Sequence, residues 1–520
     1  MSKSFYKTLV YSLGILLASS LLLADTSTEN RPNFIFVYTD DQGPWAWGLD
    51  DPDARTPNMD LIANQGARLI NSLTTTPVCS PSRASLMASR YSSELGITDY
   101  IAGASEPNVG LNPEVITWPE MLSQAGYTTG LVGKWHLGTA DRFHPTRHGY
   151  NYFAGFPTGG NTSLNPTVEI DGKPQVVQGW TPDVLTDLAI NFVRSHQATP
   201  FLLSLHFWAP HANSAERTPD GDRTWLPLSD AEWSHFSTLD PTLPEPDYPF
   251  LDIARTKRMR REYLGSIAAV DRNLGRLLQL LDDLNLSENT VVIFSSDNGF
   301  NMGHHGTWHK GNARWLLLEG IQPTGSNPWD LNPENSPRPY DNEKYTRPYD
   351  NGKGSYTRAN LWDNSLKVPT AVRWPKAIKP GTIIQQTISV MDFYPTILAM
   401  AGVSLPSGET IRGKNFLPLL KGKELDWDNN FFGQYFMDHA NIRAELRCWR
   451  TPEWKLVRDF LRSGVDELYN LREDPEEKYN LIGSQDPNIR RIRHQLNREL
   501  RDKMREINDI EAVHGWPTSN

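Results

Sequence analysis

A cysteine, Cys79, followed by serine, proline, serine and arginine is the stretch with the clearest chemical character. Pro81 suits the first turn of a helix, because the N–H that proline lacks has no partner there. Cys79 is therefore expected just before a helix N-terminus, where free N–H groups and the helix dipole favour anions. Arg83, one turn later, adds a planar set of donors that suits sulfate or phosphate. The pattern predicts a reactive residue facing a tetrahedral anion, with a buried structural cysteine as the alternative.

Acidic and amide side chains follow two apolar runs that are expected to form buried strands. Asp40 and Asp41 come after the run 33–38, and Asp297 and Asn298 end a later run. Open α/β folds keep their sites at the carboxyl ends of such strands. Adjacent carboxylates repel each other unless a cation lies between them, and hard oxygen atoms suit Ca²⁺ or Mg²⁺. These residues predict a metal site, with a solvated turn as the alternative.

Basic side chains follow two further predicted strands. Lys134 and His136 come after the strand expected over 127–133, and on an extended segment residues two apart point to the same side. His211 comes after the strand expected over 200–208. A histidine can donate or accept a proton near neutral pH, which suits acid–base chemistry. Taken alone, the Lys134–His136 pair is also consistent with a solvated loop.

Several motifs together resemble the formylglycine-dependent (type I) sulfatases of the alkaline phosphatase superfamily. The family signature is Cys-x-Pro-Ser-Arg followed by a helical segment that ends in Gly-Arg, and Ser89-Arg90 stands at that end here. Other matching blocks are 133–138 (G-K-W-H-L-G), 303–311 (G-H-H-G-T-W-H-K-G) and the tail 467–481. The resemblance covers about residues 31–483, with the motifs in the family's order.

The resemblance implies a modified residue and a metal. A maturation enzyme, the formylglycine-generating partner, would oxidise Cys79 to formylglycine (3-oxoalanine). The resemblance also implies a Ca²⁺ ion held by five residues, which are Asp40, Asp41, the modified Cys79, Asp297 and Asn298.

Catalytic roles are carried over in the same way. The resemblance implies that Arg83, Lys134 and Lys310 contact the sulfate and that His136 acts on the formylglycine hydrate. His211 would protonate the leaving group, although Ala212 and Asn213 follow it where the family usually has a proline two positions later. Lys353 is a rival for Lys310, because residues 313–353 look like an insertion that interrupts the familiar pattern. This insertion uses R-P-Y-D-N twice, at 338–342 and 347–351.

Composition limits the class of protein. The 520 residues carry a net charge of −10, which argues against a nucleic-acid binder that works through phosphate contacts. Residues 1–24 resemble a secretory signal, with Lys3 and Lys7 before an apolar run too short to span a bilayer comfortably. We therefore expect an exported protein, periplasmic or secreted, without a stable membrane span after cleavage; an uncleaved anchor is the alternative. Only Cys79 and Cys448 are present, and they either pair or leave Cys79 for chemistry.

The expected fold is α/β: an alkaline-phosphatase-like large mixed sheet flanked by helices, with a smaller C-terminal α+β domain of a short antiparallel sheet and a helix. The expected division is a signal at 1–24, a catalytic domain at 25–422 with the inserted loop 313–353, and a C-terminal subdomain at 423–520. Helices are predicted over 56–66, 118–126, 255–284, 390–402 and 486–508.

The expected function is a sulfuric ester hydrolase that releases inorganic sulfate from a sulfated poly- or oligosaccharide. Export and the long inserted loop favour a carbohydrate over a small ester, by analogy at the level of the fold. The alternatives are an aryl or small-ester sulfatase and a phosphonate or phosphate monoester hydrolase on the same core. A more distant alternative is a pseudoenzyme that binds sulfated glycans without turnover.

Overall fold

The computed structural model describes residues 31–212, 228–312, 315–317, 319, 349–350, 356–357, 359–439, 442–461 and 464–509. The predicted signal segment 1–24, Lys353 and most of the predicted insertion lie outside these residues. Among the helices of the described part, none is both long and apolar enough to cross a bilayer.

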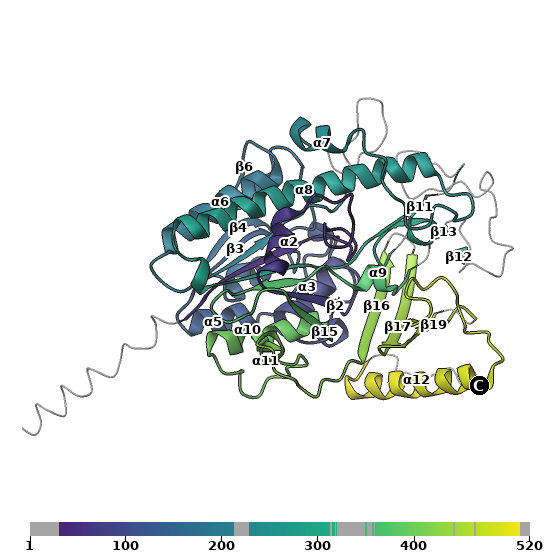
Figure 1. The fold of residues 1–520 in the computed structure, drawn as a ribbon. Coiled ribbons are helices and arrows are strands. Elements are labelled where there is room, and N and C mark those ends of the chain that lie inside the picture. The colour runs from purple at the N-terminus through teal and green to yellow at the C-terminus, as the bar shows by residue number, and fades with distance from the viewer. Residues whose placement is uncertain are drawn as a thin grey trace, which may run out of the picture.

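A ten-stranded mixed sheet forms the centre of the molecule (Figure 1). In spatial order its strands are β15 (Thr382–Ser389), β2 (Ala67–Leu73), β14 (Ala371–Arg373), β8 (Thr290–Ser296), β1 (Asn33–Thr39), β7 (Phe201–His206), β3 (Thr128–Lys134), β4 (Tyr152–Phe156), β5 (Thr167–Ile170) and β6 (Lys173–Val176). The five strands from β8 to β4 run parallel to one another. Their carboxyl ends therefore meet at one edge, as the predicted strands 33–38, 127–133, 200–208 and 290–295 require.

Both faces of the sheet are covered by helices, and β1 contributes to both apolar cores. Phe34, Phe36 and Tyr38 pack into one core, and Ile35 and Val37 pack into the other. This division follows from the strand's period of two. The first core lies under α3 (Cys79–Ala88), α5 (Trp118–Gln124) and α10 (Phe393–Ala401). The second lies under α2 (Pro57–Asn64), α6 (Thr181–His196) and α8 (Ile253–Asp283).

Shorter elements connect these layers. The short helices are α4 (Ser92–Leu95), α7 (Asp230–Phe236), α9 (Asp363–Leu366) and α11 (Leu417–Leu420). The 3₁₀ turns are η1 (Gly103–Ser105), η2 (Asp141–Phe143), η3 (Pro145–Arg147), η4 (Ser287–Asn289), η5 (His304–Gly306) and η6 (Val390–Asp392). There are also two small sheets. One is formed by β9 (Asn301–Met302), β10 (Thr307–His309) and β11 (Trp315–Leu316), and the other by β12 (Tyr349–Asp350) and β13 (Tyr356–Thr357).

A carboxylate from another helix caps α2. Its N-cap residue, Thr56, makes no capping hydrogen bond with its side chain. Asp271 on α8 accepts hydrogen bonds instead from the backbone N–H groups of Asn58 at 3.0 Å and Met59 at 2.8 Å. The first N–H groups of a helix have no partner within it, so Asp271 satisfies two of them and joins α8 to α2.

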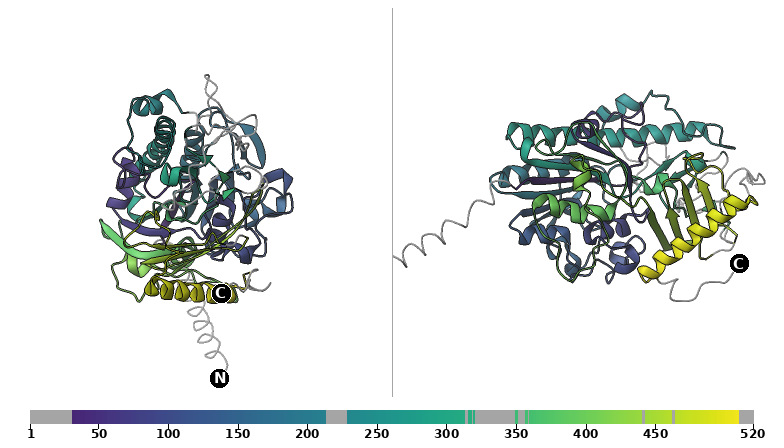
Figure 2. Two further views of the ribbon diagram at one scale, coloured as in Figure 1. Left: turned by 90° about the vertical axis from the view of Figure 1, so that its right-hand side faces the viewer. Right: turned by 60° about the horizontal axis from the view of Figure 1, so that its bottom comes forward.

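The C-terminal part forms a separate antiparallel sheet with one covering helix (Figure 2). Its elements are β16 (Phe431–His439), β17 (Ile442–Arg450), β18 (Trp454–Asp459), β19 (Glu467–Asn470) and α12 (Pro487–Glu506). The predicted short antiparallel sheet and closing helix are confirmed. Cys448 is buried in β17, and neither cysteine of the chain forms a disulfide.

A buried charge cluster joins this C-terminal sheet to the large sheet. The carboxylate of Asp363 on α9 pairs with Arg450 of β17 at 3.0 Å and Lys455 of β18 at 2.9 Å. Helix α9 in turn packs against Gly299, where a Cβ atom would lie 2.2 Å from the Asn364 carbonyl oxygen. The C-terminal sheet therefore supports, through α9, the loop that follows β8.

Candidate active site

The predicted functional side chains meet at the carboxyl edge of the parallel strands. Asp40 and Asp41 follow β1, Asp297 and Asn298 follow β8, and Lys134 is the last residue of β3. All five are fully buried. The geometry of a parallel sheet alone accounts for their meeting, since β8, β1, β7 and β3 are consecutive parallel strands.

Helix α3 brings Cys79 to the same edge. The helix begins at Cys79 itself, one residue earlier than the sequence suggested, because Val78 is extended (φ −150°) and caps it. Ser80 Oγ accepts a hydrogen bond from the Ile101 N–H at 3.1 Å and so fixes the first turn. Burial raises the pKa of the Cys79 thiol, which weakens it as a nucleophile because the thiolate is the reactive form.

Three carboxylates alternate with three cations beside Cys79. Lys134 Nζ donates to Asp40, Lys310 Nζ donates to Asp41 at 2.6 Å, and Arg83 Nε donates to Asp297 at 2.8 Å. Burial opposes ionisation of all three acids. The nearby lysines still hold the pKa of Asp40 and of Asp41 below its usual value. The pKa of Asp297 is raised by burial and by the charge of Asp40.

Several buried oxygen atoms in this cluster have no hydrogen-bond partner among the described residues. They are Asp40 Oδ1, Asp41 Oδ2 and Asn298 Oδ1. A buried polar atom without a partner is costly, and hard oxygen ligands such as these suit a divalent cation. Ligand atoms of Asp40, Asp41 and His211 also lie within 4.8 Å of one another, close enough to hold one metal ion.

Arg83 is held by the ends of two neighbouring strands. Its Nη1 donates to the Lys134 carbonyl at 3.0 Å, and His206, the last residue of β7, donates to that same oxygen from Nδ1 at 3.1 Å. His206 is not among the predicted site residues, although it too ends a parallel strand. Arg83 Nη2 is buried without a partner in the described part of the chain, and so remains available to an anion.

His136 does not share a strand with Lys134 as the sequence suggested. Strand β3 ends at Lys134, and His136 has a left-handed backbone (φ 59°) because the chain turns toward residues 157–160. His136 Nε2 lies 2.9 Å from the Ile101 carbonyl oxygen, which can only accept, so Nε2 is the donor. Burial, together with the charge of Lys134, holds the pKa of His136 well below its usual value. The ring is therefore neutral and carries its lone pair on Nδ1, which has no partner among the described residues.

His211 is more open than the other site residues. Its side chain is 24% exposed, and its Nε2 lies 3.7 Å from Asp41 Oδ2. Nδ1 donates to the Ala212 carbonyl at 2.8 Å, and Trp208 stacks on the ring with centroids 6.1 Å apart. Loss of water around the ring lowers the pKa of His211, against the attraction of Asp41 and Asp40.

Lys310 reaches the site from the loop after β10. The Lys310 carbonyl accepts from Asn360 Nδ2 at 3.3 Å, and the next N–H, of Gly311, donates to the Pro77 carbonyl at 3.2 Å. The loop that carries Lys310 is therefore anchored to Pro77, two residues before Cys79. Lys353, the rival for this role, lies outside the described residues.

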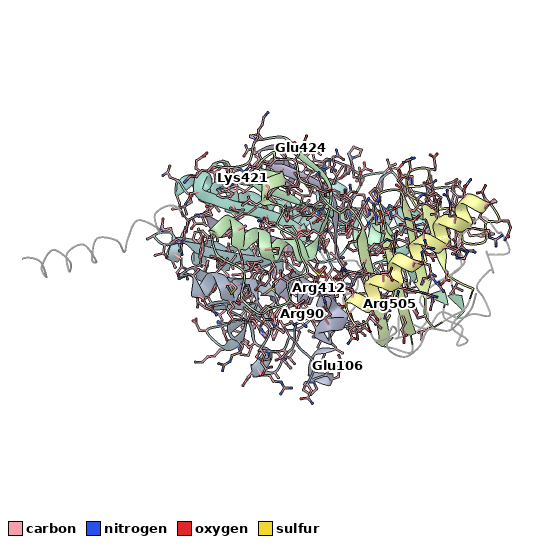
Figure 3. The ribbon with its side chains drawn as sticks, turned by 90° about the horizontal axis from the view of Figure 1, so that it is seen from below. Arg90, Glu106, Arg412, Lys421, Glu424 and Arg505 are labelled. Carbon is pink, nitrogen blue, oxygen red and sulfur yellow. The ribbon has the colours of Figure 1, made fainter. Side chains whose placement is uncertain are left out.

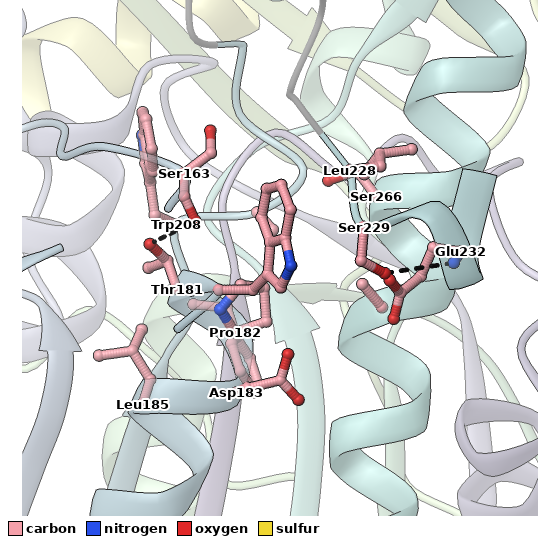
Figure 4. Close-up of a pocket in the computed structure, with 14 residues that line it drawn as sticks. Ser163, Thr181, Pro182, Asp183, Leu185, Trp208, Leu228, Ser229, Glu232 and Ser266 are labelled. Atoms are coloured by element: carbon pink, nitrogen blue, oxygen red, sulfur yellow. Dashed lines mark hydrogen bonds between the residues drawn. The ribbon is translucent and has the colours of Figure 1, made fainter. Parts of the chain in front are cut away.

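A small cavity is lined in part by residues 207–209, which shortly precede His211 (Figure 4). Trp180, Leu185, Phe207 and Trp208 contribute to its lining, and its volume is about 30 Å³. That volume admits water but no sugar ring. A larger cavity of about 330 Å³ lies between residues 96–100 and the β16–β17 hairpin. Its lining residue Tyr100 directly precedes Ile101, whose carbonyl accepts a hydrogen bond from His136, and the cavity has room for a small ligand.

Comparison with known proteins identifies the family. Residues 32–403 match the family model described as Sulfatase, and residues 352–506 match the one described as N-sulphoglucosamine sulphohydrolase, C-terminal. The chain belongs to the sulfatase family. It is a sulfuric ester hydrolase, as the signature around Cys79 predicted.

Curated sulfatases align with most of the chain. An N-acetylglucosamine-6-O-sulfatase of Bacteroides thetaiotaomicron is 26% identical, and the alignment covers 92% of this chain and 88% of the relative. Human steryl-sulfatase is 28% identical over 83% of this chain and 77% of the relative.

Solved structures show that the fold is that of the sulfatases. One, a complex with its substrate D-glucosamine-2-N,6-O-disulfate, has a TM-score of 0.73 at 23% identity and covers 93% of this chain and 99% of the other. A phosphonate monoester hydrolase of Agrobacterium radiobacter has a TM-score of 0.62 at 18% identity, with 92% and 96% covered. The expected fold class is confirmed.

Proposed function

We propose that this sulfatase releases inorganic sulfate from a sulfated carbohydrate, with a formylglycine at position 79 and Ca²⁺. The observation that carries the proposal is the alternation of three acids and three cations around the start of α3. Relatives named as N-acetylglucosamine-6-O-sulfatase, N-acetylgalactosamine-6-sulfatase and ulvan-active sulfatase support a carbohydrate substrate. The cavity of about 330 Å³, lined in part by residues 96–100, has room for a sugar unit of such a substrate.

Ca²⁺ would be held by oxygen atoms of Asp40, Asp41, Asp297, Asn298 and the modified residue 79. The unpartnered buried oxygens of Asp40, Asp41 and Asn298 support three of these five ligands, since they are hard donors. The ion would supply positive charge to the sulfate oxygens and lower the pKa of a bound hydroxyl.

Residue 79 would act as formylglycine, whose hydrate supplies one hydroxyl as nucleophile and a second whose deprotonation allows sulfate to leave. The raised pKa of the Cys79 thiol supports this over a thiolate mechanism. Its position at the first residue of α3 would also direct backbone N–H groups toward the anion.

The remaining residues would bind the sulfate and transfer protons. Charge builds on the sulfate oxygens as sulfur is attacked, and Arg83, Lys134 and Lys310 would stabilise it, Arg83 through its free Nη2. Asp297 would orient or deprotonate the attacking hydroxyl. His211, helped by Lys310, would protonate the departing alcohol. His136 would accept the second hydroxyl's proton on Nδ1, because Nε2–H is engaged with Ile101.

The first experiment is the mass of the tryptic peptide 69–83 from active protein, combined with a screen of sulfate esters. We expect an aldehyde at position 79 and sulfate release from sulfated saccharides. An unmodified thiol in protein that still turns over would rule out the formylglycine mechanism. Release from small aryl esters but from no sulfated saccharide would rule out the carbohydrate assignment, and the Cys79→Ala variant is the inactive control.

A phosphonate or phosphate monoester hydrolase is the second candidate, because a phosphonate monoester hydrolase shares the fold. The ratio of kcat/KM on an aryl sulfate and the matching aryl phosphate decides between them. Binding of sulfated glycan by fully modified protein without any turnover would favour the pseudoenzyme alternative.

Processing and domain limits complete the proposal. A signal at 1–24 would direct export to the periplasm or the exterior, and a formylglycine-generating enzyme would modify Cys79. The catalytic domain would extend over 25–422 and the C-terminal subdomain over 423–520. N-terminal sequencing of the secreted protein tests the first limit, since a mature chain that begins near residue 25 is expected.

A further inference from the structure

Helix α12 carries much of its positive charge along one stripe, which we call the α12 basic face. It is formed by Arg490, His494, Arg498, Arg501 and Arg505. Their spacing of four, four, three and four residues puts them on one side of an α-helix. This side adjoins the buried row of Leu496, Leu500 and Met504 that packs against the C-terminal sheet.

The basic face is open to solvent and is only partly neutralised. Arg490, His494, Arg498 and Arg505 are exposed, and Arg501 is half-buried. Arg490, His494 and Arg498 make no side-chain hydrogen bond or ion pair with any residue that the structure describes. Partial burial, with Arg458 and Arg505 close by, lowers the pKa of Arg501, as expected where positive charges gather.

Two of the three acidic residues of α12 pair with groups outside the stripe. Glu499 accepts a hydrogen bond from Trp449 Nε1 at 2.8 Å. Glu506 pairs with Arg412 at 3.3 Å and with Lys503 at 2.9 Å. Asp502 pairs with Arg505, which still leaves Arg490 and Arg498 uncompensated. The part of the stripe from Arg490 to Arg498 therefore has no acidic partner among the described residues of α12.

A local positive stripe on an acidic chain indicates a specific anionic partner. The whole chain has a net charge of −10, so it does not attract polyanions over its full surface. From residue 490 to residue 505 the stripe is roughly 22 Å long at 1.5 Å per residue. An extended, repeatedly charged chain can contact all of it, and a single small anion cannot.

The C-terminal end of the stripe is connected to the helix that carries Cys79. Figure 3 shows α12 on the outside of the C-terminal sheet, with Arg505 at the end toward Arg412. Arg412 pairs with Glu506, and its N–H donates to the carbonyl of Ser89, the residue that caps α3, at 2.8 Å. Arg412 therefore links the C-terminal end of α12 to the C-terminal end of α3, the helix that begins at Cys79.

We propose that the α12 basic face is a second docking surface for a sulfated polysaccharide chain whose ester is cleaved at the strand-end site. The inference rests on the proposed function, because it takes the partner's charge from the proposed substrate. An anionic membrane is the weaker candidate, since α12 carries no Trp or Phe and its two leucines, Leu496 and Leu500, are buried against the protein.

The test compares two double variants with equal changes of charge. Arg490→Gln with Arg498→Gln removes two cations from the stripe, and Lys379→Gln with Lys423→Gln removes two exposed cations elsewhere. Dextran sulfate serves as the immobilised polyanion, and elution salt is the readout. We expect the stripe variant to elute at lower salt than the wild type and the control variant to elute unchanged.

Kinetics on two substrates complete the test. For a sulfated polysaccharide, the stripe variant is expected to lose about threefold to tenfold in kcat/KM through a higher KM at low salt. For a sulfated monosaccharide that the wild type hydrolyses, kcat/KM is expected to stay unchanged, because a single sugar cannot reach both sites.

Three results would overturn the inference: unchanged elution from dextran sulfate, an equal loss on polysaccharide and monosaccharide, or a stripe-dependent binding to phosphatidylserine vesicles without binding to dextran sulfate. If the wild type releases sulfate from no carbohydrate, the proposed function fails by itself. The dextran sulfate comparison still decides whether the basic face binds sulfated chains.

Discussion

Gly159 lies directly against the imidazole of His136. A Cβ atom at position 159 would be 2.6 Å from His136 Cε1 and Nε2, closer than any stable contact. The next residue, Gly160, faces Trp208 instead, where a Cβ atom would be 3.5 Å from the ring and make an ordinary contact. Trp208 in turn stacks on His211. One short loop after β4 therefore borders His136 directly and is linked to His211 through Trp208.

This difference between two adjacent glycines gives a sharp prediction. Gly159→Ala is expected to displace the His136 ring and break its hydrogen bond to Ile101, lowering kcat by up to about 100-fold. Gly160→Ala is the control and is expected to retain most of the activity. Equal activity of the two variants, at equal melting temperature, would show that the position of His136 does not limit turnover.

Removal of the metal should lower stability as well as activity. Ca²⁺ at 100 times its Kd would add about 2.7 kcal/mol to the free energy of unfolding, if it binds only the folded state. We expect EDTA to lower the melting temperature and added Ca²⁺ to restore it. Asp41→Asn should abolish this Ca²⁺-dependent shift, whereas Asp240→Asn, at an exposed carboxylate on another segment, should retain it. A melting temperature that does not respond to Ca²⁺ in active wild-type protein would refute the proposed ion.

The gathering of acids at the sheet edge was predictable because it depends on local patterns. An apolar run followed by Asp40 and Asp41, or by Asp297 and Asn298, indicates a buried strand that ends in polar residues. In a parallel sheet such ends meet, whatever the loops do. The start of α3 was predictable in the same way, because Pro81 favours the first turn of a helix. The observed start, at Cys79, differs from the predicted one by one residue.

The details that orient the side chains were not predictable, because they depend on distant segments. The hydrogen bond from His136 to Ile101 spans 35 residues, and the one from His206 to Lys134 spans 72. The left-handed backbone at His136 follows from packing against the 157–160 loop, and strand alternation gives no sign of it. Gly159 has no chemistry of its own, so its importance appears only in the folded structure.

The buried cluster at Asp363 should be a strong determinant of stability. Arg450→Met leaves the buried Asp363 carboxylate with less compensation, and breaking such a pair typically costs about 3–5 kcal/mol. We expect the free energy of unfolding, measured with denaturant, to fall by that amount. Activity should fall as well, because α9 supports the loop that carries Asp297 and Asn298.

The matched control for this variant is Arg472→Met. Arg472 also pairs with an acid, Glu453, but its side chain is 64% exposed. A surface ion pair contributes about 0–1 kcal/mol to stability, so the free energy of unfolding of Arg472→Met is expected to change little. If Arg450→Met were as mild as Arg472→Met, the C-terminal sheet would not depend on this cluster for its attachment.

Asp271, which caps α2 from α8, should make stability depend on pH. Burial raises the pKa of Asp271 from 3.8 to about 6, against the hydrogen bonds that it accepts from Asn58 and Met59. The folded state therefore binds a proton more tightly than the unfolded state. The protonated Asp271 side chain therefore contributes fully to the free energy of unfolding below pH 3.8. This contribution is lost as the pH rises through about 6, a change of roughly 3 kcal/mol.

Asp271→Asn isolates this contribution, because asparagine keeps the shape of the neutral acid and does not titrate. The unfolding free energy of the wild type relative to Asp271→Asn is expected to fall between pH 4 and pH 7, as measured by urea unfolding at each pH. If that difference rises with pH instead, the N-terminus of α2 favours the charged carboxylate more than burial opposes it. The pKa of Asp271 would then lie below 3.8, and the cap would act as an ion at the helix dipole.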